Sequence, residues 1–265
     1  MEVQRSSAAR TVQVRDVPVP GFPAVHHPGW THGFPWLVQG TTTRAVGDAA
    51  TEFDLRLFGE GRPTPAVTAR WEALRTTTGL PVAVHARQVH GAVVRGHDRA
   101  AADEVAAGMR IPEECDGHVT DAAGILLAVS IADCVPVSVV NPLTRRIGLL
   151  HAGWRGAAAG ILERGLSEVA VGGARAGLLV HLGPSICGRC YQVGPEVFEA
   201  LGRPRPSCPE PIDLRAVLAE RAVAAGVDPA GVSVSERCTR CEPEVFFSHR
   251  GGDTGRQVAY LGVRG

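Results

Sequence analysis

Apolar residues in this chain fall into two patterns that alternate along its length. Short β-branched runs, such as those between Ile125 and Leu150, are typical of buried strands. Segments that place residues such as Ile161, Leu166 and Val169 on one face predict helices. The predicted strands are Val82–Val89, Ile125–Ile131, Val135–Val140, Ile147–Leu150, Gly177–Leu182, Val245–Phe247 and Val258–Leu261. The predicted helices are Ala66–Thr78, Ala100–Gly108, Gly156–Val171, Glu196–Leu201 and Leu214–Ala225. This mixture predicts an α/β (mixed α+β) fold in a single domain.

The first 30 residues differ from the rest of the chain. They are rich in Pro, Gly and His and have no clear period, so we expect a loosely ordered N-terminal arm over residues 1–30 and a single domain over residues 31–265. The opening MEVQRSSAAR has no apolar core of a secretory signal. The most apolar stretch, residues 125–140, is interrupted by polar residues and Pro136, which a membrane span would not tolerate. We therefore expect a cytoplasmic protein without a membrane partner.

Charge and composition exclude several classes of function. The chain has 27 basic and 27 acidic residues, and this balance argues against a nucleic-acid partner or an anionic membrane surface. All 27 basic residues are arginine, so a Schiff-base lysine, a pyridoxal-phosphate anchor and a P-loop lysine are excluded. Any anion held by a charged side chain must be held by arginine or by protonated histidine.

Three segments share one design, in which a buried strand runs into a turn of small residues that carries one metal-binding side chain. They are QVHG with His90, ADCVPV with Cys134, and HAGWRG with His151. Imidazole and thiolate are preferred zinc ligands, and three protein ligands leave a fourth position open, as in catalytic sites. The gaps of 44 and 17 residues match no short metal motif. From the residues alone, a core cysteine and two turn histidines remain the alternative.

Together with GPSICGRCYQVG and FFSHRGGDTGR, these motifs resemble the YfiH/laccase-domain (FAMIN-like) family of purine nucleoside phosphorylases, once described as polyphenol oxidases. The resemblance runs from Gln39 to Val263. It implies one zinc ion held by His90, Cys134 and His151, and a YfiH/CNF1-like domain of layered β-sheets flanked by helices. It also implies phosphorolysis of adenosine, inosine and methylthioadenosine, together with deamination of adenosine. The partners would be nucleoside and phosphate, and we expect a monomer.

Other residues are candidates for roles in that chemistry. Zinc makes water acidic enough to attack an electron-poor carbon such as C6 of adenine. Asp116 or Asp133 could orient a ligand or carry the proton, although either could be a turn residue. Arg155 lies where a helix is expected to begin after His151, so we expect it to bind phosphate. The candidates for substrate binding are Arg44, Gln88, Phe247, Arg250 and Arg256.

Two departures from the family pattern affect these candidates. After Arg44 the chain reads AVGDAATEFDL, without the usual glycine pair, which puts the N-terminal substrate contacts in question. The C-terminal motif reads His249-Arg250-Gly251, with one arginine where the family usually has two.

A second cysteine set consists of two C-x-x-C pairs, Cys187/Cys190 and Cys238/Cys241. Four thiolates in this arrangement suit a structural zinc, but relatives that share the neighbouring motifs lack some of these thiols, so the sequence favours free or loosely paired thiols over a second zinc.

Three rival functions remain open. His90, Cys134 and His151 could form a type 1 copper site of a polyphenol oxidase, but the His-x-His pairs of a multicopper enzyme are missing from the sequence. Cys134 could be the nucleophile and His151 the base of a hydrolase that edits cell-wall precursors. A zinc-stabilised module without activity is the third rival, and an open three-ligand site argues against it.

Overall fold

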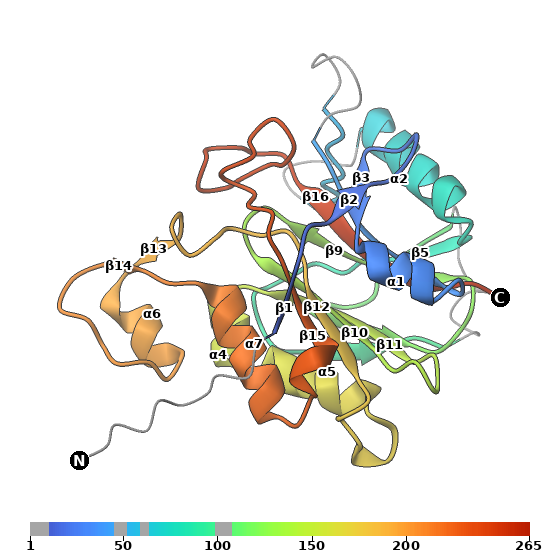
Figure 1. Ribbon diagram of the computed structural model, residues 1–265. Helices are drawn as coiled ribbons and strands as arrows, with labels where there is room; N and C mark the ends of the chain where they lie inside the picture. Colours follow the sequence, from blue (N-terminus) through green and yellow to red (C-terminus); the bar gives the residue numbers. More distant parts are fainter. Residues whose placement is uncertain (1–10, 45–51, 59–63, 99–107) are drawn as a thin grey trace.

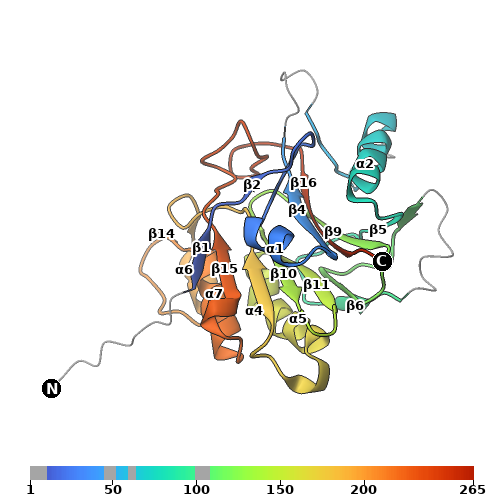
Figure 2. The same cartoon turned by 45° about the vertical axis from the view of Figure 1, so that its right-hand side comes forward.

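The computed structural model describes residues 11–44, 52–58, 64–98 and 108–265 (Figure 1). Within these ranges two seven-stranded sheets lie face to face, and a short pair of strands, β13 (Gln192–Val193) and β14 (Glu210–Pro211), lies apart from them. Figures 1 and 2 show α2 on one side of the two sheets and α5 and α7 on the other. None of the helices in the described ranges is long and apolar enough to cross a bilayer.

The first sheet contains both parallel and antiparallel pairs. In spatial order its strands are β1 (Val12–Val14), β15 (Val232–Ser235), β12 (Leu179–Leu182), β10 (Val135–Val140), β11 (Ile147–Ala152), β8 (Gly117–Thr120) and β6 (Val94–Gly96). β10 pairs antiparallel with β11 and β12, whereas β1 and β12 run parallel to β15 and β6 runs parallel to β8.

The second sheet is also mixed. In spatial order its strands are β2 (Val17–Pro18), β3 (Ala24–His26), β4 (Leu37–Thr42), β16 (Gln257–Val263), β9 (Ile125–Ile131), β5 (Val82–Val84) and β7 (Met109–Arg110). β16 pairs antiparallel with β4 and β9, and β5 runs parallel to β9 and β7. The helices are α1 (Pro28–Gly33), α2 (Pro65–Thr78), α4 (Trp154–Ala158), α5 (Ile161–Val169), α6 (Pro195–Ala200) and α7 (Leu214–Ala224), with short 3₁₀ turns η2 (Val171–Gly173) and η3 (Pro229–Gly231).

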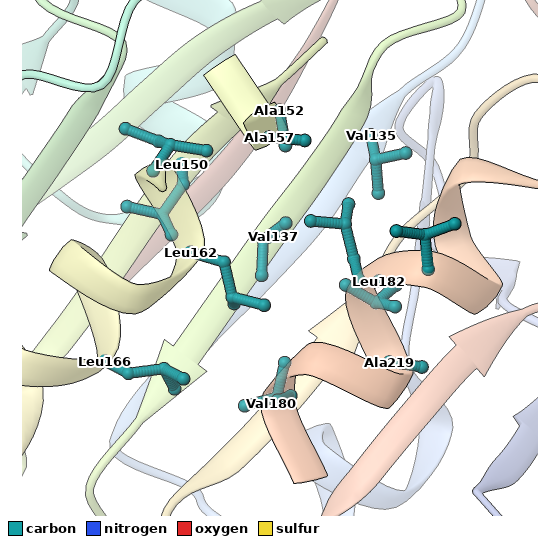
Figure 3. Packing of buried hydrophobic residues seen from close by; sticks show 14 of the residues in the cluster. Val135, Val137, Leu150, Ala152, Ala157, Leu162, Leu166, Val180, Leu182 and Ala219 are labelled. Atoms are coloured by element: carbon teal, nitrogen blue, oxygen red, sulfur yellow. The ribbon is translucent and has the colours of Figure 1, made fainter. Parts of the chain in front are cut away.

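Three apolar layers hold these elements together. One fills the space between the first sheet and α4 to α7, a second lies between the two sheets, and the third lies between the second sheet and α2, where it includes Trp71 and Leu74. Figure 3 shows the first layer, in which side chains of β10, β11 and β12 point toward those of α5 and α7. Burial of this apolar area is the main favourable contribution to folding.

The alternation of side chains along β11 determines where His151 lies. Leu150 and Ala152 belong to the layer under the helices, whereas Ile147 and Leu149 belong to the layer between the sheets. Because strand side chains alternate between faces, His151 points to the same side as Leu149, toward the second sheet. It stands opposite Pro136, beside the end of β11. The alternation of side chains along β11 therefore places the imidazole of His151 at the edge of the space between the sheets.

Most of the predicted elements are confirmed. The strands at 125–131 and 135–140 match β9 and β10, and the predicted helices at 66–78, 196–201 and 214–225 match α2, α6 and α7 to within one residue. Gly156–Val171 is divided into α4 and α5, because Gly160 adopts the left-handed conformation (φ +84°) between them. Val82–Val89 is a strand only over β5, and its remainder forms the loop that carries His90. The predicted helix Ala100–Gly108 lies outside the described residues apart from Gly108.

Two predictions differ from the structure. Val245–Phe247 is not a strand, because the backbone N–H and C=O of Phe247 both pair with the side-chain amide of Gln257, at 2.7 and 2.9 Å, instead of with a neighbouring strand. Residues 11–30 of the expected loose arm are ordered into β1, β2, β3 and α1. β1 extends the first sheet beside β15, and β3 pairs with β4 of the second. Such short strands escape periodicity analysis because they contain only two or three residues.

Candidate metal centre and adjoining cavities

Two of the three predicted metal ligands lie where the chain passes from one sheet to the other, and the third lies near the end of a strand. His90 lies in the connection from β5 of the second sheet to β6 of the first, and Cys134 lies in the connection from β9 to β10. His151 comes from β11, next to β10. Two crossovers and one strand end therefore meet at one edge of the sheets, which explains how residues far apart in sequence come together.

The donor atoms of His90, Cys134 and His151 all lie within 4.8 Å of one another. His90 is exposed, Cys134 is half-buried and His151 is buried, so the group faces solvent on one side. Gly153 allows this close approach, because a Cβ atom there would lie 3.0 Å from Cδ2 of His90 and 3.2 Å from Sγ of Cys134. Two imidazoles and one thiolate that converge with an open side fit a zinc ion with three protein ligands.

Asp116 holds two of these three ligands in position. Its buried carboxylate accepts hydrogen bonds from the backbone N–H groups of Val89, His90 and Gly91 at 3.2, 2.9 and 2.7 Å. It also pairs with Nδ1 of His151 at 2.8 Å. When Nδ1–H donates to the carboxylate, Nε2 is left with a lone pair for a metal ion. Asp116 therefore positions the ligands and does not itself belong to the group of ligands.

Protonation in the metal-free protein couples Cys134 to His151. Burial by itself would raise the pKa of the Cys134 thiol, but the neighbouring His151 and His90 rings lower this pKa to about 6. Burial would likewise lower the pKa of His151, but the Cys134 sulfur and the Asp116 carboxylate raise it to about 9. Near neutral pH the two groups form a thiolate–imidazolium pair. Zinc would replace the proton on His151, because a metal ligand must be a neutral imidazole.

Two residues of the site adopt the left-handed backbone conformation that favours glycine. The φ angle is +59° at His90 and +89° at Asp133. Residues held in this region cost free energy and persist only where their surroundings fix them. The Asp133 carboxylate accepts hydrogen bonds from Oγ1 of Thr239 and from the backbone N–H of Arg250, both at 2.7 Å. Its backbone carbonyl accepts from the N–H of Ile186 at 3.1 Å. Asp133 thus joins three loops, and both of its carboxylate oxygens are engaged in hydrogen bonds.

Two cavities adjoin the predicted ligands. The smaller, here called the Trp154 cavity, measures about 270 Å³ and is lined by His90, Ala132, Asp133, Cys134, Gly153, Trp154, Arg155, Ile186, Tyr191, Leu214, His249 and Arg250. The larger, here called the Arg256 cavity, measures about 440 Å³ and is lined by Arg56, Leu57, Phe58, His85, Arg87, Gln88, His90, Ser130, Ala132, Cys134, His151, His249 and Arg256. Both share His90 and Cys134, so a metal ion at this centre would border both cavities.

Arginines line both cavities. In the Trp154 cavity, the guanidinium groups of Arg155 and Arg250 lie over the rings of Trp154 and Tyr191, at 4.3 and 5.0 Å from the ring centres. Within the described residues neither group has a carboxylate partner, and Arg250 donates to the carbonyl of Gln192 at 2.8 Å. In the Arg256 cavity, Nη1 of Arg256 donates to backbone carbonyls of its own loop. Burial and the nearby Arg56 lower the pKa of Arg256.

Three other predicted substrate residues have different surroundings. Arg44 pairs with Glu52 at 2.7 Å and with Asp253 at 3.0 Å, and it lies over the ring of Phe247. Phe247 is buried, and neither Arg44 nor Phe247 lines the two cavities. The amide of Gln88 donates to the carbonyl of Ser130 at 2.8 Å and accepts from its N–H at 2.7 Å. Gln88 thereby attaches the His90 loop to β9 and borders the Arg256 cavity.

The structure adds residues to the site beyond those predicted from the sequence. Tyr191 and His249 occur within the motifs GRCYQVG and SHRG, so the resemblance of these motifs to those of the family could have indicated them. His85 borders the Arg256 cavity, and its Nε2 lies 2.7 Å from Oγ of Ser130. Thr239 has no signal in the sequence, because its contact with Asp133 joins residues 106 positions apart.

The second cysteine set also comes together. The sulfur atoms of Cys187, Cys190, Cys238 and Cys241 all lie within 4.8 Å of one another, and all seven cysteines of the chain are free of disulfides. The two C-x-x-C pairs therefore form a second possible metal site.

Comparison with known proteins relates this chain to one family. The family model described as "Multi-copper polyphenol oxidoreductase laccase" matches residues 38–264. "Purine nucleoside phosphorylase YlmD" of Geobacillus stearothermophilus is 42% identical over 165 residues, which cover 56% of this chain and 60% of that protein. "Adenosine deaminase RL5" of an unknown prokaryotic organism is 37% identical over 150 residues, which cover 52% and 57%. The matched segments thus span less than two thirds of these two relatives.

A longer match and two crystal structures extend the comparison. A purine nucleoside phosphorylase of Mycobacterium bovis is 34% identical over 228 residues, covering 82% of this chain and 88% of that protein. The crystal structure of YlmD from Geobacillus stearothermophilus, 30% identical, superposes with a TM-score of 0.80 over 95% of this chain and 100% of that one. The structure of YfiH from Bacillus licheniformis, 24% identical, gives 0.81 over 93% and 98%. These two structures confirm the predicted fold class.

Proposed function

Because this chain belongs to the multi-copper polyphenol oxidoreductase laccase family, as its motifs predict, we propose that it is a zinc-dependent purine nucleoside phosphorylase that also deaminates adenosine. We propose adenosine, inosine and methylthioadenosine as nucleoside substrates, phosphate as the second substrate, and a monomer as the active form. The names of the relatives from Geobacillus, Mycobacterium and the unidentified prokaryote support both reactions. The single observation that carries the proposal is the group of His90, Cys134 and His151 at the junction of two cavities.

Zinc is preferred to copper at this centre for two reasons. Two imidazoles and one thiolate with an open fourth position are typical of catalytic zinc. A multicopper oxidase also needs a second cluster built from several histidines. In the described part of the chain the groups that bring three or more ligand side chains together are this centre and the four cysteines. Although the family description includes the word laccase, the ligand groups in the described residues do not favour a laccase reaction.

The residues of the site have separable tasks in this proposal. Asp116 holds the His90 loop and keeps the proton of His151 on Nδ1. Asp133 fixes the backbone of Arg250 and so the wall of the Trp154 cavity. The chemistry that zinc supplies at such a centre is Lewis acidity toward a water molecule or a substrate oxygen at the open position.

We assign the two substrates to different cavities. The Arg256 cavity, at about 440 Å³, falls within the usual size of small-molecule sites, about 300–1,000 Å³. We place the nucleoside there, beside Phe58 and His85. The Trp154 cavity, at about 270 Å³, suits a smaller ligand, and its guanidinium groups Arg155 and Arg250 lack carboxylate partners within the described residues. Such groups bind phosphate through charge-assisted hydrogen bonds. We therefore place phosphate there.

The test is a product analysis. Purified protein is incubated with adenosine, with and without phosphate, and the products are separated. Phosphate-dependent release of adenine and ribose 1-phosphate, together with slower formation of inosine, is the expected result. Treatment with a chelator should abolish both reactions, and added zinc should restore them. Oxidation of phenols by a copper-loaded sample, without phosphate-dependent cleavage of any purine nucleoside, would overturn the proposal.

A second candidate is favoured by one observation. The pKa of the Cys134 thiol is lowered to about 6 beside His151, as in a cysteine nucleophile paired with a base. We therefore retain a cysteine hydrolase acting on cell-wall precursors as the alternative. Such an enzyme would need Cys134 for turnover but not for metal content, and this difference separates the two functions.

A further inference from the structure

The four cysteines outside the proposed catalytic centre form a compact group with the geometry of a closed metal site. Cys187 and Cys190 lie between β12 and β13, and Cys238 and Cys241 lie between β15 and β16. The sulfur atom of Cys241 is 3.4 Å from that of Cys190 and 4.0 Å from that of Cys187, and all four lie within 4.8 Å. Four thiolates bound to zinc at about 2.3 Å in a tetrahedron are separated by about 3.8 Å. The observed spacing is close to this value.

Backbone contacts hold the two C-x-x-C loops against each other independently of any metal. The N–H of Cys187 donates to the sulfur of Cys238 at 3.2 Å. The N–H of Thr239 donates to the carbonyl of Ser185 at 3.2 Å, and Ser185 and Cys238 form an isolated parallel bridge. Hydrogen bonds of this kind orient thiolates and tune them as metal ligands. The site is therefore arranged by the fold and is not a chance meeting of surface cysteines.

The same two loops build a wall of the Trp154 cavity. Ile186, next to Cys187, donates its N–H to the carbonyl of Asp133 at 3.1 Å, and Tyr191 follows Cys190 and lines the cavity. On the other loop, Thr239 donates to the Asp133 carboxylate at 2.7 Å. Both loops thus contact the residue that precedes Cys134. A link between the loops would stabilise the strained Asp133 turn from both sides.

We propose that Cys187, Cys190, Cys238 and Cys241 bind a structural zinc ion, and that this ion joins the two loops that position Asp133 and Tyr191 at the cavity. A site with four protein ligands is closed, so it has no position for substrate. Its contribution is to the stability of the cavity wall. The effect on substrate affinity rests on the proposed function, whereas the binding of zinc does not.

The experiment compares Cys241→Ser with Cys208→Ser, a matched control because Cys208 is an exposed free thiol outside the group. Both are purified without added metal and analysed for zinc. We expect about two zinc ions per chain in the unaltered protein and in the control, and the loss of one ion in Cys241→Ser. The remaining ion should still be lost on Cys134→Ala. Unchanged zinc content in Cys241→Ser would overturn the proposal.

A second measurement uses the unaltered protein, so that it holds even if Cys241→Ser fails to fold. The protein is treated briefly with an alkylating reagent, before and after addition of a strong chelator. Mass spectrometry of its cysteine-containing peptides then shows which cysteines have been alkylated. Cys208 should react at once, and the four clustered cysteines should react only after the chelator. Immediate reaction of the cluster, or a disulfide between Cys190 and Cys241, would contradict the proposal. Assays of nucleoside cleavage then test the effect on the cavity separately. The expected result for Cys241→Ser is a higher KM for the substrates of this reaction, with the catalytic zinc retained.

Discussion

Replacement of Asp116 by asparagine keeps the size of the side chain but removes its charge and one acceptor oxygen. In the structure Oδ1 accepts from His90 N–H and pairs with His151 Nδ1, and Oδ2 accepts from the N–H groups of Val89 and Gly91. The asparagine NH₂ group must replace one of the two oxygens. With Nδ1 of His151 protonated, as metal binding at Nε2 requires, the NH₂ group faces two donors whichever way the amide is turned, so two of the four hydrogen bonds are lost.

The size of the effect follows from these contacts. A hydrogen bond to a charged group contributes about 1.5–3 kcal/mol, so two lost bonds cost about 3–6 kcal/mol in total. Part of this cost lowers the stability of the metal-free protein, because the His90 loop is less well held. The part that misorients His151 lowers metal affinity, and changes at such supporting residues typically weaken metal binding about 10- to 100-fold. That range corresponds to about 1.4–2.7 kcal/mol.

Zinc affinity is measured by competition with a chelator in a Cys241→Ser background, so that the four-cysteine group does not contribute. Asp133→Asn is the matched control, because Asp133 precedes Cys134 directly but its carboxylate accepts from Thr239 and Arg250 and contacts no ligand side chain. We expect weaker zinc binding for Asp116→Asn and nearly unchanged zinc binding for Asp133→Asn. Zinc affinity of Asp116→Asn within twofold of the parent would refute the role assigned to this carboxylate.

Three further predictions follow from the same geometry. Arg155→Ala should raise the KM for phosphate about tenfold and spare deamination, whereas Arg256→Ala should raise the KM for adenosine. The opposite pattern would mean that phosphate binds in the Arg256 cavity and the nucleoside in the Trp154 cavity. Because the pKa of His151 is raised to about 9 in the metal-free protein, zinc should displace about one proton at pH 7.5 and should bind more tightly as the pH rises to about 9. Calorimetry in two buffers measures the protons released, and the absence of proton release would contradict this prediction. Gly153→Ala should weaken zinc binding about tenfold, because the added Cβ would lie 3.2 Å from the sulfur of Cys134, and unchanged affinity would argue against a centre at this position.

Local patterns predicted the strands and helices that carry many apolar residues. β9, β10 and α2 follow directly from their β-branched or periodic stretches. The short strands β1 and β3 could not be predicted in this way, because their pairing with β15 and β4 depends on contacts between distant parts of the chain. Phe247 shows the opposite error. An apolar stretch there suggested a strand, but a side-chain amide supplies its backbone partners.

The three ligands of the centre were predictable from residue types and from motifs that resemble those of the family. The hydrogen-bond and ion-pair partners around the centre were not. His90 and Cys134 follow strands, His151 lies near the end of one, and the structure brings these three metal-binding side chains together. The sequence does not reveal that Asp116 bonds to two of the ligand segments or that Arg44 is engaged by Glu52 and Asp253. Such pairings depend on which loops lie next to each other in the folded protein, and a single sequence does not show this.

The most direct test of zinc-dependent chemistry at this centre is a joint measurement on Cys134→Ala. Zinc content and phosphate-dependent release of adenine from adenosine are determined on the same sample, beside the unaltered protein. We predict that Cys134→Ala loses one zinc ion per chain relative to the unaltered protein and loses turnover with it, since the thiolate is a ligand. Full zinc content with turnover abolished would contradict the account and identify Cys134 as a nucleophile.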